Sequence, residues 1–110
     1  MNYSKRYISD IIEGEINNMP DKEIDRDIRR FERINKKLGV KDAVCITDGE
    51  IRIRDFEEIE NLKFAKMYKV DFNGREIQFI VETLIGQTYV YVNEEDADRL
   101  IMVLSYDDIE

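Results

Sequence analysis

The chain has 110 residues, of which 43% are hydrophobic and 38% are charged, and its formal net charge at pH 7 is -8. This length and composition are typical of one folded domain, and they exclude a disordered chain. We therefore expect a single α+β domain over residues 1–110. No apolar run approaches the length of a membrane span, and residues 1–20 lack a signal-peptide pattern, so a cytoplasmic protein with no membrane partner is expected.

Two helices are predicted in the first third of the chain. Residues 4–18 carry isoleucines at three- and four-residue steps, with Ser4 as a candidate N-cap and Glu15 falling on the inward side. Residues 21–38 form the clearest helix, because acids fill its first turn, bases fill its last turn, and Gly39 follows as a candidate C-cap. Its apolar residues form a stripe about 120° wide, as expected for a face that packs on a core. These residues are Ile24, Ile28, Phe31, Ile34 and Leu38.

The middle of the chain changes to strand chemistry, rich in Val, Ile, Phe and Tyr. The predicted strands are residues 43–47, 50–54, 64–72, 75–83 and 88–92. Asp48-Gly49 and Asn73-Gly74 predict two-residue hairpin turns, because both of their residues tolerate positive φ angles. Gly86-Gln87 gives a weaker turn signal, and residues 55–62 fit either a helical turn or a loop.

A last helix is predicted from Asn93, with acids in its first turn and an apolar face formed by Ala97, Leu100, Ile101 and Leu104. The predicted order is ααβββββα: two N-terminal helices, an antiparallel meander of about five strands, and a C-terminal helix. Helices grouped at the two ends of a sheet built from hairpins indicate an α+β fold. We expect the helices to pack on one sheet face.

The chain has no His, no Trp and one Cys, which restricts its chemistry. Cys45 lies in an apolar stretch, and a catalytic thiol would need a basic partner, so a buried structural role is favoured. General acid–base catalysis would depend on carboxylates with strongly shifted pKa values, and structural zinc lacks its usual ligands. We expect no catalytic residue, no metal site, no cofactor and no enzymatic activity. The density of carboxylates leaves one alternative, a divalent-metal-dependent enzyme on a phosphorylated substrate.

The last third of the chain is an acidic surface candidate. Residues 75–110 contain 2 Lys/Arg and 9 Asp/Glu, whereas residues 1–39 contain 9 and 8. The helix dipole explains acids in a first helical turn but not acids beyond the last turn. The predicted partner-binding residues are Glu94, Glu95, Asp98, Asp107, Asp108 and Glu110. The alternative is that these charges serve only solubility.

Bases of the second helix gather opposite its apolar stripe, which indicates a surface for a phosphate backbone or an acidic protein. The secondary candidates there are Arg26, Arg29, Arg30 and Arg33. The competing interpretation is a solvated helix whose bases suit the helix dipole and pair with neighbouring acids.

Strand alternation adds four more candidates. Arg52 and Arg54 share one face of residues 50–54, and Tyr89 and Tyr91 share one face of residues 88–92. If the valines of the second strand face the helices, both tyrosines lie on the uncovered face, where Tyr beside Arg is typical of a binding hot spot. The alternative is that the tyrosines are interior.

These features favour a small acidic, non-enzymatic module that binds a protein with a basic surface. Its most specific form is an inhibitor, of the immunity or phage anti-defence type of prokaryotes, that acts as a nucleic-acid mimic and blocks the nucleic-acid site of a nuclease or effector. The alternatives are a homo-oligomeric interaction protein, such as a homodimer, and the metal-dependent enzyme. Direct nucleic-acid binding is disfavoured because the domain carries eight net negative charges.

Overall fold

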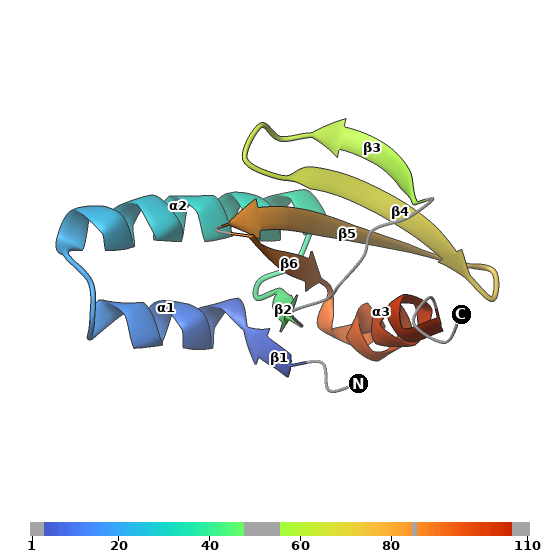
Figure 1. Ribbon diagram of the computed structural model, residues 1–110, viewed down its shortest axis with the longest axis horizontal. Helices are drawn as coiled ribbons and strands as arrows, with labels where there is room; N and C mark the ends of the chain where they lie inside the picture. Colours follow the sequence, from blue (N-terminus) through green and yellow to red (C-terminus); the bar gives the residue numbers. More distant parts are fainter. Residues whose placement is uncertain (1–3, 48–55, 85, 107–110) are drawn as a thin grey trace.

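The computed structural model describes residues 4–47, 56–84 and 86–106. Within these residues the elements follow in the order β1 (Ser4–Tyr7), α1 (Ile8–Ile16), α2 (Asp21–Leu38), β2 (Val44–Thr47), β3 (Glu57–Asn61), β4 (Lys66–Phe72), β5 (Arg75–Leu84), β6 (Gln87–Val92) and α3 (Glu94–Tyr106). All six strands form one antiparallel sheet in the order β1-β2-β6-β5-β4-β3 (Figure 1). The predicted α+β class is confirmed, as are the three helices and their positions along the chain.

The helices cover both faces of the sheet, so the prediction that they pack on one face is wrong. Figure 1 shows α1 and α2 side by side and α3 apart from them. Val90 and Val92 of β6 pack with Leu100 of α3, whereas Tyr91 between them packs with Phe31 of α2. Alternate residues of a strand point to opposite faces. Because the central strands are apolar on both faces, each face needs its own layer of helix.

The first helix begins at Ile8, because residues Ser4–Tyr7 pair with β2 as a strand. Ser4 is therefore not the N-cap. Asp42, which precedes β2, replaces it: its Oδ1 accepts a hydrogen bond from the Ser9 backbone N–H at 3.0 Å, and its Oδ2 accepts one from Ser9 Oγ at 2.6 Å. A carboxylate at this position satisfies a backbone donor and suits the positive end of the helix dipole.

The second helix follows its prediction at both ends. Gly39 has φ 71°, and its backbone N–H donates to the carbonyl oxygens of Asn35 and Lys36. This left-handed cap ends the helix where the sequence indicates. The inner face of α2 buries Ile24, Phe31 and Ile34.

The hairpin at Asn73-Gly74 is confirmed. Both residues have positive φ, 52° and 85°, and β4 pairs with β5 on either side of them. β5 and β6 pair up to Leu84 and Gln87, with Gly86 at φ 74° in the turn. The predicted strand 50–54 and its Asp48-Gly49 turn lie outside the described residues.

An acidic edge strand, β3, occupies part of the segment predicted as a helical turn or loop. Its side chains are exposed, and lysines of β4 hold it: Lys66 Nζ lies 3.3 Å from Glu58 Oε1, and Lys69 Nζ lies 3.6 Å from Glu57 Oε2. Opposite charges across neighbouring strands compensate for the low strand propensity of glutamate.

Candidate functional site

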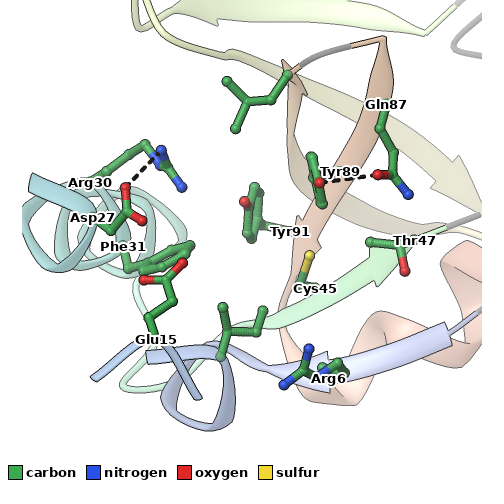
Figure 2. Close-up of a pocket in the computed structure, with 12 residues that line it drawn as sticks. Arg6, Glu15, Asp27, Arg30, Phe31, Cys45, Thr47, Gln87, Tyr89 and Tyr91 are labelled. Atoms are coloured by element: carbon green, nitrogen blue, oxygen red, sulfur yellow. Dashed lines mark hydrogen bonds and ion pairs between the residues drawn. The ribbon is translucent and has the colours of Figure 1, made fainter. Parts of the chain in front are cut away.

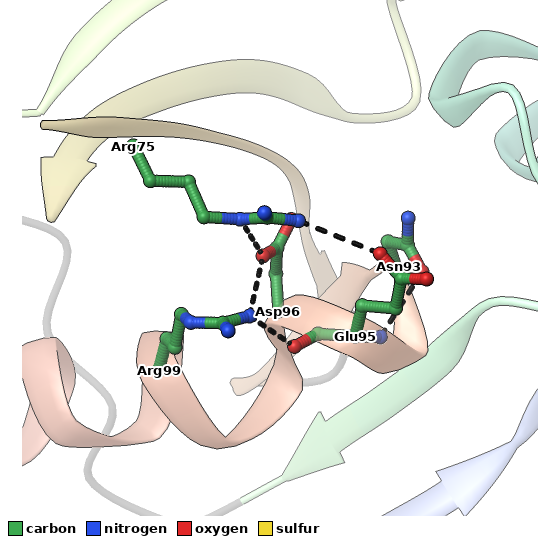
Figure 3. A network of polar contacts seen from close by, with 5 residues as sticks. All are labelled: Arg75, Asn93, Glu95, Asp96 and Arg99. Carbon is green, nitrogen blue, oxygen red and sulfur yellow. Dashed lines mark hydrogen bonds and ion pairs between the residues drawn. The ribbon is translucent and has the colours of Figure 1, made fainter.

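Acids at the start of α3, where the acidic surface is predicted, take part in a polar network between α3 and β5 (Figure 3). Asp96 is 7% exposed, and its Oδ1 lies 2.6 Å from Arg75 Nε and 3.2 Å from Arg99 Nη1. Glu95 Oε2 lies 3.5 Å from Arg75 Nη2, and the Glu95 backbone N–H donates to Asn93 Oδ1 at 3.1 Å. The hydrogen bond to Asp96 raises the pKa of Arg75. The network links Arg75, the first residue of β5, to α3.

Two further acids of α3 contact β1. Lys5 Nζ lies 2.6 Å from Asp98 Oδ1, and the Tyr7 hydroxyl donates a hydrogen bond to Glu94 Oε1. This hydrogen bond raises the pKa of Tyr7. Both contacts follow from the strand period, because residues 5 and 7 of β1 face α3. The acids at this end of α3 therefore hold the edge strand of the sheet.

The charge offered by this surface is smaller than the sequence indicates. Three of the four carboxylates of α3, those of Glu95, Asp96 and Asp98, contact the cations Lys5, Arg75 and Arg99, and the fourth, Glu94, accepts from the Tyr7 hydroxyl. The side chains of Glu95 and Asp98 nevertheless stay 76% and 81% exposed. The other predicted acids, Asp107, Asp108 and Glu110, lie outside the described residues.

The outward face of α2 carries a straight row of five exposed cations, here called the cation stripe. It consists of Lys22, Arg26, Arg29, Arg33 and Lys36. Their spacings of four, three, four and three residues keep them within about 40° of the direction opposite the apolar stripe. Among the described residues, no carboxylate lies within 4.0 Å of any of the five.

The structure separates Arg30 from the other predicted arginines of α2. Its guanidinium turns inward, with Nη1 3.2 Å from Asp27 Oδ1 and Nε 3.2 Å from Glu82 Oε2. Arg33 stays on the outward face, where its guanidinium lies 5.5 Å from the ring centre of Phe64. Three of the four predicted arginines therefore belong to the stripe, and Arg30 belongs to the interior.

The tyrosines of β6 share a face as predicted, but α1 and α2 cover it. Tyr91 is 2% exposed, and its hydroxyl donates to Glu82 Oε1 at 3.0 Å, so the interior alternative is correct for this residue. Burial raises its pKa. Tyr89 is half-buried and donates to Gln87 Oε1 at 3.2 Å. The predicted Arg52 and Arg54 lie outside the described residues.

A cavity of about 400 Å³ opens between this sheet face and the helix pair α1 and α2 (Figure 2). Its volume is in the range of small-molecule sites. Phe31, Tyr91 and Leu84 give it apolar and aromatic walls, and Arg6 of β1 lines it as well. No carboxylate of the described residues lies within 4.0 Å of the Arg6 guanidinium.

Three carboxylates gather at the α2 end of this cavity around one guanidinium. Glu82 is 1% exposed and Asp27 contacts Arg30 directly, while Glu15 of α1 lies beside Asp27. Burial, together with the neighbouring Asp27 carboxyl group, raises the pKa of Glu15 to about 7, and burial also raises the pKa of Glu82. Glu15 Oε2 is buried without a hydrogen-bond partner among the described residues. We call Glu15, Asp27, Glu82 and Arg30 the carboxylate cluster.

Cys45 lines the same cavity and is buried at its sheet wall. Burial raises its pKa to about 12, so the thiolate that a nucleophile requires is scarce.

Within the part of the chain that the structure describes, no group of three or more His, Cys, Asp or Glu side chains is arranged to hold a metal ion. No described helix is long and apolar enough to cross a membrane.

Sequence reasoning missed the carboxylate cluster and Arg6 as site residues. A signal existed for Glu15, which falls on the inward side of its helix, and for Glu82, which lies in an apolar strand. The contact between Glu15 and the other residues of the cluster depends on how α1 and α2 cross the sheet, which local patterns do not specify.

No protein-family model, curated protein or solved structure matches this chain.

Proposed function

We propose that this chain is a non-enzymatic protein-binding module whose cation stripe on α2 docks on an acidic segment of a partner protein. One observation carries the proposal. The five cations of the stripe are exposed and have no described carboxylate within 4.0 Å, whereas three of the four acids of α3, namely Glu95, Asp96 and Asp98, already contact cations of their own chain. A surface charge that already has an opposite charge beside it contributes less electrostatic binding energy toward a partner than a charge without one.

The shape of the stripe favours an acidic protein helix over a nucleic acid. Acids flank it on both sides of α2, with Asp25 and Glu32 on one side and Glu23 on the other. A duplex groove would bring phosphates against these flanking carboxylates. A partner helix with carboxylates at the same three- and four-residue spacing would meet only the cations, as charged rows do along paired helices.

The acids of α3 do not oppose this docking, although the whole chain has a net charge of -8. α2 and α3 lie on opposite faces of the sheet. The packing distance between layers is about 10 Å on each side of the sheet. The separation between α2 and α3 therefore exceeds the screening length of about 8 Å at physiological ionic strength. The partner therefore experiences mainly the local charge of α2.

A defined probe tests the proposal: a synthetic helical peptide as long as α2 with glutamates at four-three spacing. The control peptide has the same composition in scrambled order. We expect salt-sensitive binding of the ordered peptide by fluorescence anisotropy, weakened about tenfold by Arg29→Glu and little changed by Lys41→Glu, an equal charge reversal off the stripe. Equal binding of both peptides would refute the proposal, and tighter binding of duplex DNA would replace it with a nucleic-acid function.

The acidic-surface inhibitor of a nuclease is a second candidate, favoured by the exposure of Glu95 and Asp98, at 76% and 81% of their side chains. Its partner would have to compete with Lys5 and Arg75 for these carboxylates. Removing the competing lysine with Lys5→Ala should then strengthen capture of a basic nuclease, and Asp98→Lys should abolish it. If neither variant changes capture, the acidic surface does not bind the nuclease.

Self-association of the cation stripe with the acidic α3 of a second copy is a third candidate, and it needs no partner of another kind. Sedimentation over a range of protein concentrations separates it from the module. A mass that rises with concentration in the native chain, and not in Arg29→Glu, would make the homo-oligomer the better account.

A further inference from the structure

The carboxylate cluster holds three carboxylates but a single cation. One guanidinium, that of Arg30, serves Asp27 and Glu82 at 3.2 Å each, and Glu15 lies beside Asp27 without a cation of its own. Glu15 Oε2 is buried without a hydrogen bond to any described residue, and Arg30 Nε, although 3.2 Å from Glu82 Oε2, is not aligned to donate to it. Buried polar atoms are normally satisfied by protein, water or ligand. A donor arriving from the cavity would satisfy Glu15.

The walls beside the cluster suit an organic group rather than a bare ion. Phe31 and Tyr91 place two aromatic rings next to the carboxylates, with ring centres 6.2 Å apart, and Leu84 adds an aliphatic surface. An ammonium group gains from carboxylates and from nearby aromatic faces at the same time. A bare divalent metal ion would instead require several oxygen ligands, and Arg30 already occupies the centre of the cluster.

We propose that this cavity binds a small organic amine, with its ammonium group against Glu15 and Asp27 and its carbon stem against Phe31, Tyr91 and Leu84. Arg6 lines the cavity too and has no described carboxylate within 4.0 Å. Its guanidinium is placed to donate to an oxygen elsewhere on the ligand. The preferred class is therefore an amine that also carries an oxygen acceptor.

This site is separate from the cation stripe. The cavity lies on the inner side of α2, and the stripe lies on its outer side, so a ligand in the cavity touches none of the five cations. Loss of amine binding would leave the proposed docking intact, and loss of docking would leave the cavity intact.

The test uses benzylamine as the probe and benzyl alcohol, its uncharged counterpart, as the control, in an NMR titration of the full chain. We expect saturable shifts from benzylamine at Glu15, Asp27 and Tyr91, and none from benzyl alcohol at equal concentration. Glu15→Gln should weaken benzylamine binding about tenfold, the effect of one charge-assisted hydrogen bond. Glu13→Gln, which removes the same charge from an exposed position of α1, should not change it.

Affinity should also rise as pH increases through about 7, because Glu15 then loses its proton. Melting curves of both glutamine variants verify that they fold. Equal binding of benzylamine and benzyl alcohol would overturn the proposal, and so would an unchanged affinity in a folded Glu15→Gln. Preferential binding of benzoate would overturn it as well, because the cavity would then be an anion site at Arg6.

Discussion

Arg30 of α2 holds its Nε 3.2 Å from Oε2 of Glu82 in β5, and Glu82 is 1% exposed. This ion pair joins the helix layer to the sheet at the α2 end of the cavity. The Tyr91 hydroxyl supplies a second contact to the same carboxylate. The pair therefore determines both how α2 packs on the sheet and which charges reach the cavity.

Arg30→Met should destabilise the fold by about 3 kcal/mol, because it leaves the buried Glu82 carboxylate without its cation. Adding Glu82→Gln should recover most of this loss, since the amide keeps a partner for Tyr91 and needs no counter-charge. Urea unfolding at pH 7.0 measures both, with Arg29→Met as the exposed control. A loss below about 1 kcal/mol in Arg30→Met would show that the carboxylate is protonated or reached by water.

The pKa of Glu15 predicts how stability depends on pH. Its folded value of about 7 lies above its usual value of 4.5, because burial and the neighbouring Asp27 favour the protonated form. The folded state thus holds the proton more tightly than the unfolded state, so this group stabilises the fold below pH 4.5, and the stabilisation is lost as pH rises toward 7.

Glu15→Gln should remove this dependence and raise the free energy of unfolding at pH 8 by about 1 kcal/mol, given some solvent contact at the cavity mouth. Asp27 and Arg30 face Glu15 from α2, and Arg30 partly offsets the shift. Denaturant unfolding at several pH values compares the variant with Glu13→Gln. Parallel curves for the native chain and Glu15→Gln would contradict the assignment of this titration to Glu15.

Two glycines should respond to alanine in opposite directions. Gly39 has φ 71° at the end of α2, where a side chain strains the backbone although the space around it is open, so Gly39→Ala should cost about 1 kcal/mol. Gly14 lies inside α1, and an added Cβ would meet only Arg6 Nη2 at an ordinary 3.9 Å, so Gly14→Ala should stabilise by about 0.5–1 kcal/mol. Thermal melting reports both signs. A stabilising Gly39→Ala would mean that the left-handed cap is absent in solution.

Cys45 should resist thiol reagents in the native protein. Its side chain is buried, and burial raises its pKa to about 12, so little thiolate is present at pH 8. Labelling with a coloured disulfide reagent should be slow in buffer and fast in denaturant. Rapid stoichiometric labelling of the folded chain would show that the cavity exposes the sulfur.

The carboxylates of α3 should differ sharply in their effect on stability. Asp96 is 7% exposed and contacts Arg75 and Arg99, so Asp96→Ala should destabilise by about 2 kcal/mol. Asp98→Ala removes only an exposed pair with Lys5 and should change stability by less than about 0.5 kcal/mol. Chemical denaturation compares the two, and equal losses would show that the network in Figure 3 does not hold α3 to β5.

Local chemistry predicted the elements whose causes lie within a few residues. α2 was predicted at both ends because its charge distribution and its Gly39 cap are local signals. The Asn73-Gly74 turn was predicted because its two positive φ angles depend on the turn residues alone. Strands β1 and β3 were missed, because their partners lie elsewhere: β1 becomes a strand through β2, and the glutamates of β3 are held by lysines of β4.

The placement of helices on both faces has a local signal in the sequence of β2. Val44, Cys45 and Ile46 are three consecutive buried residues of β2, and such a run is typical of a strand covered on both sides. The candidate site shows the same contrast between features with a local cause and features that depend on distant residues. The exposed cations of α2 follow from the helix period, but the inward turn of Arg30 depends on Glu82, which is 52 positions later in the sequence.

The strand order also has a consequence for synthesis on the ribosome. β2 leaves the tunnel early, yet one of its two neighbours in the sheet is β6, which emerges only after β3, β4 and β5. Until then the nascent chain holds α1, α2 and β2 beside an open sheet edge, and it cannot bury Phe31 against Tyr91. Closure of the native sheet therefore waits for β6, and we expect the incomplete chain to expose apolar surface until then.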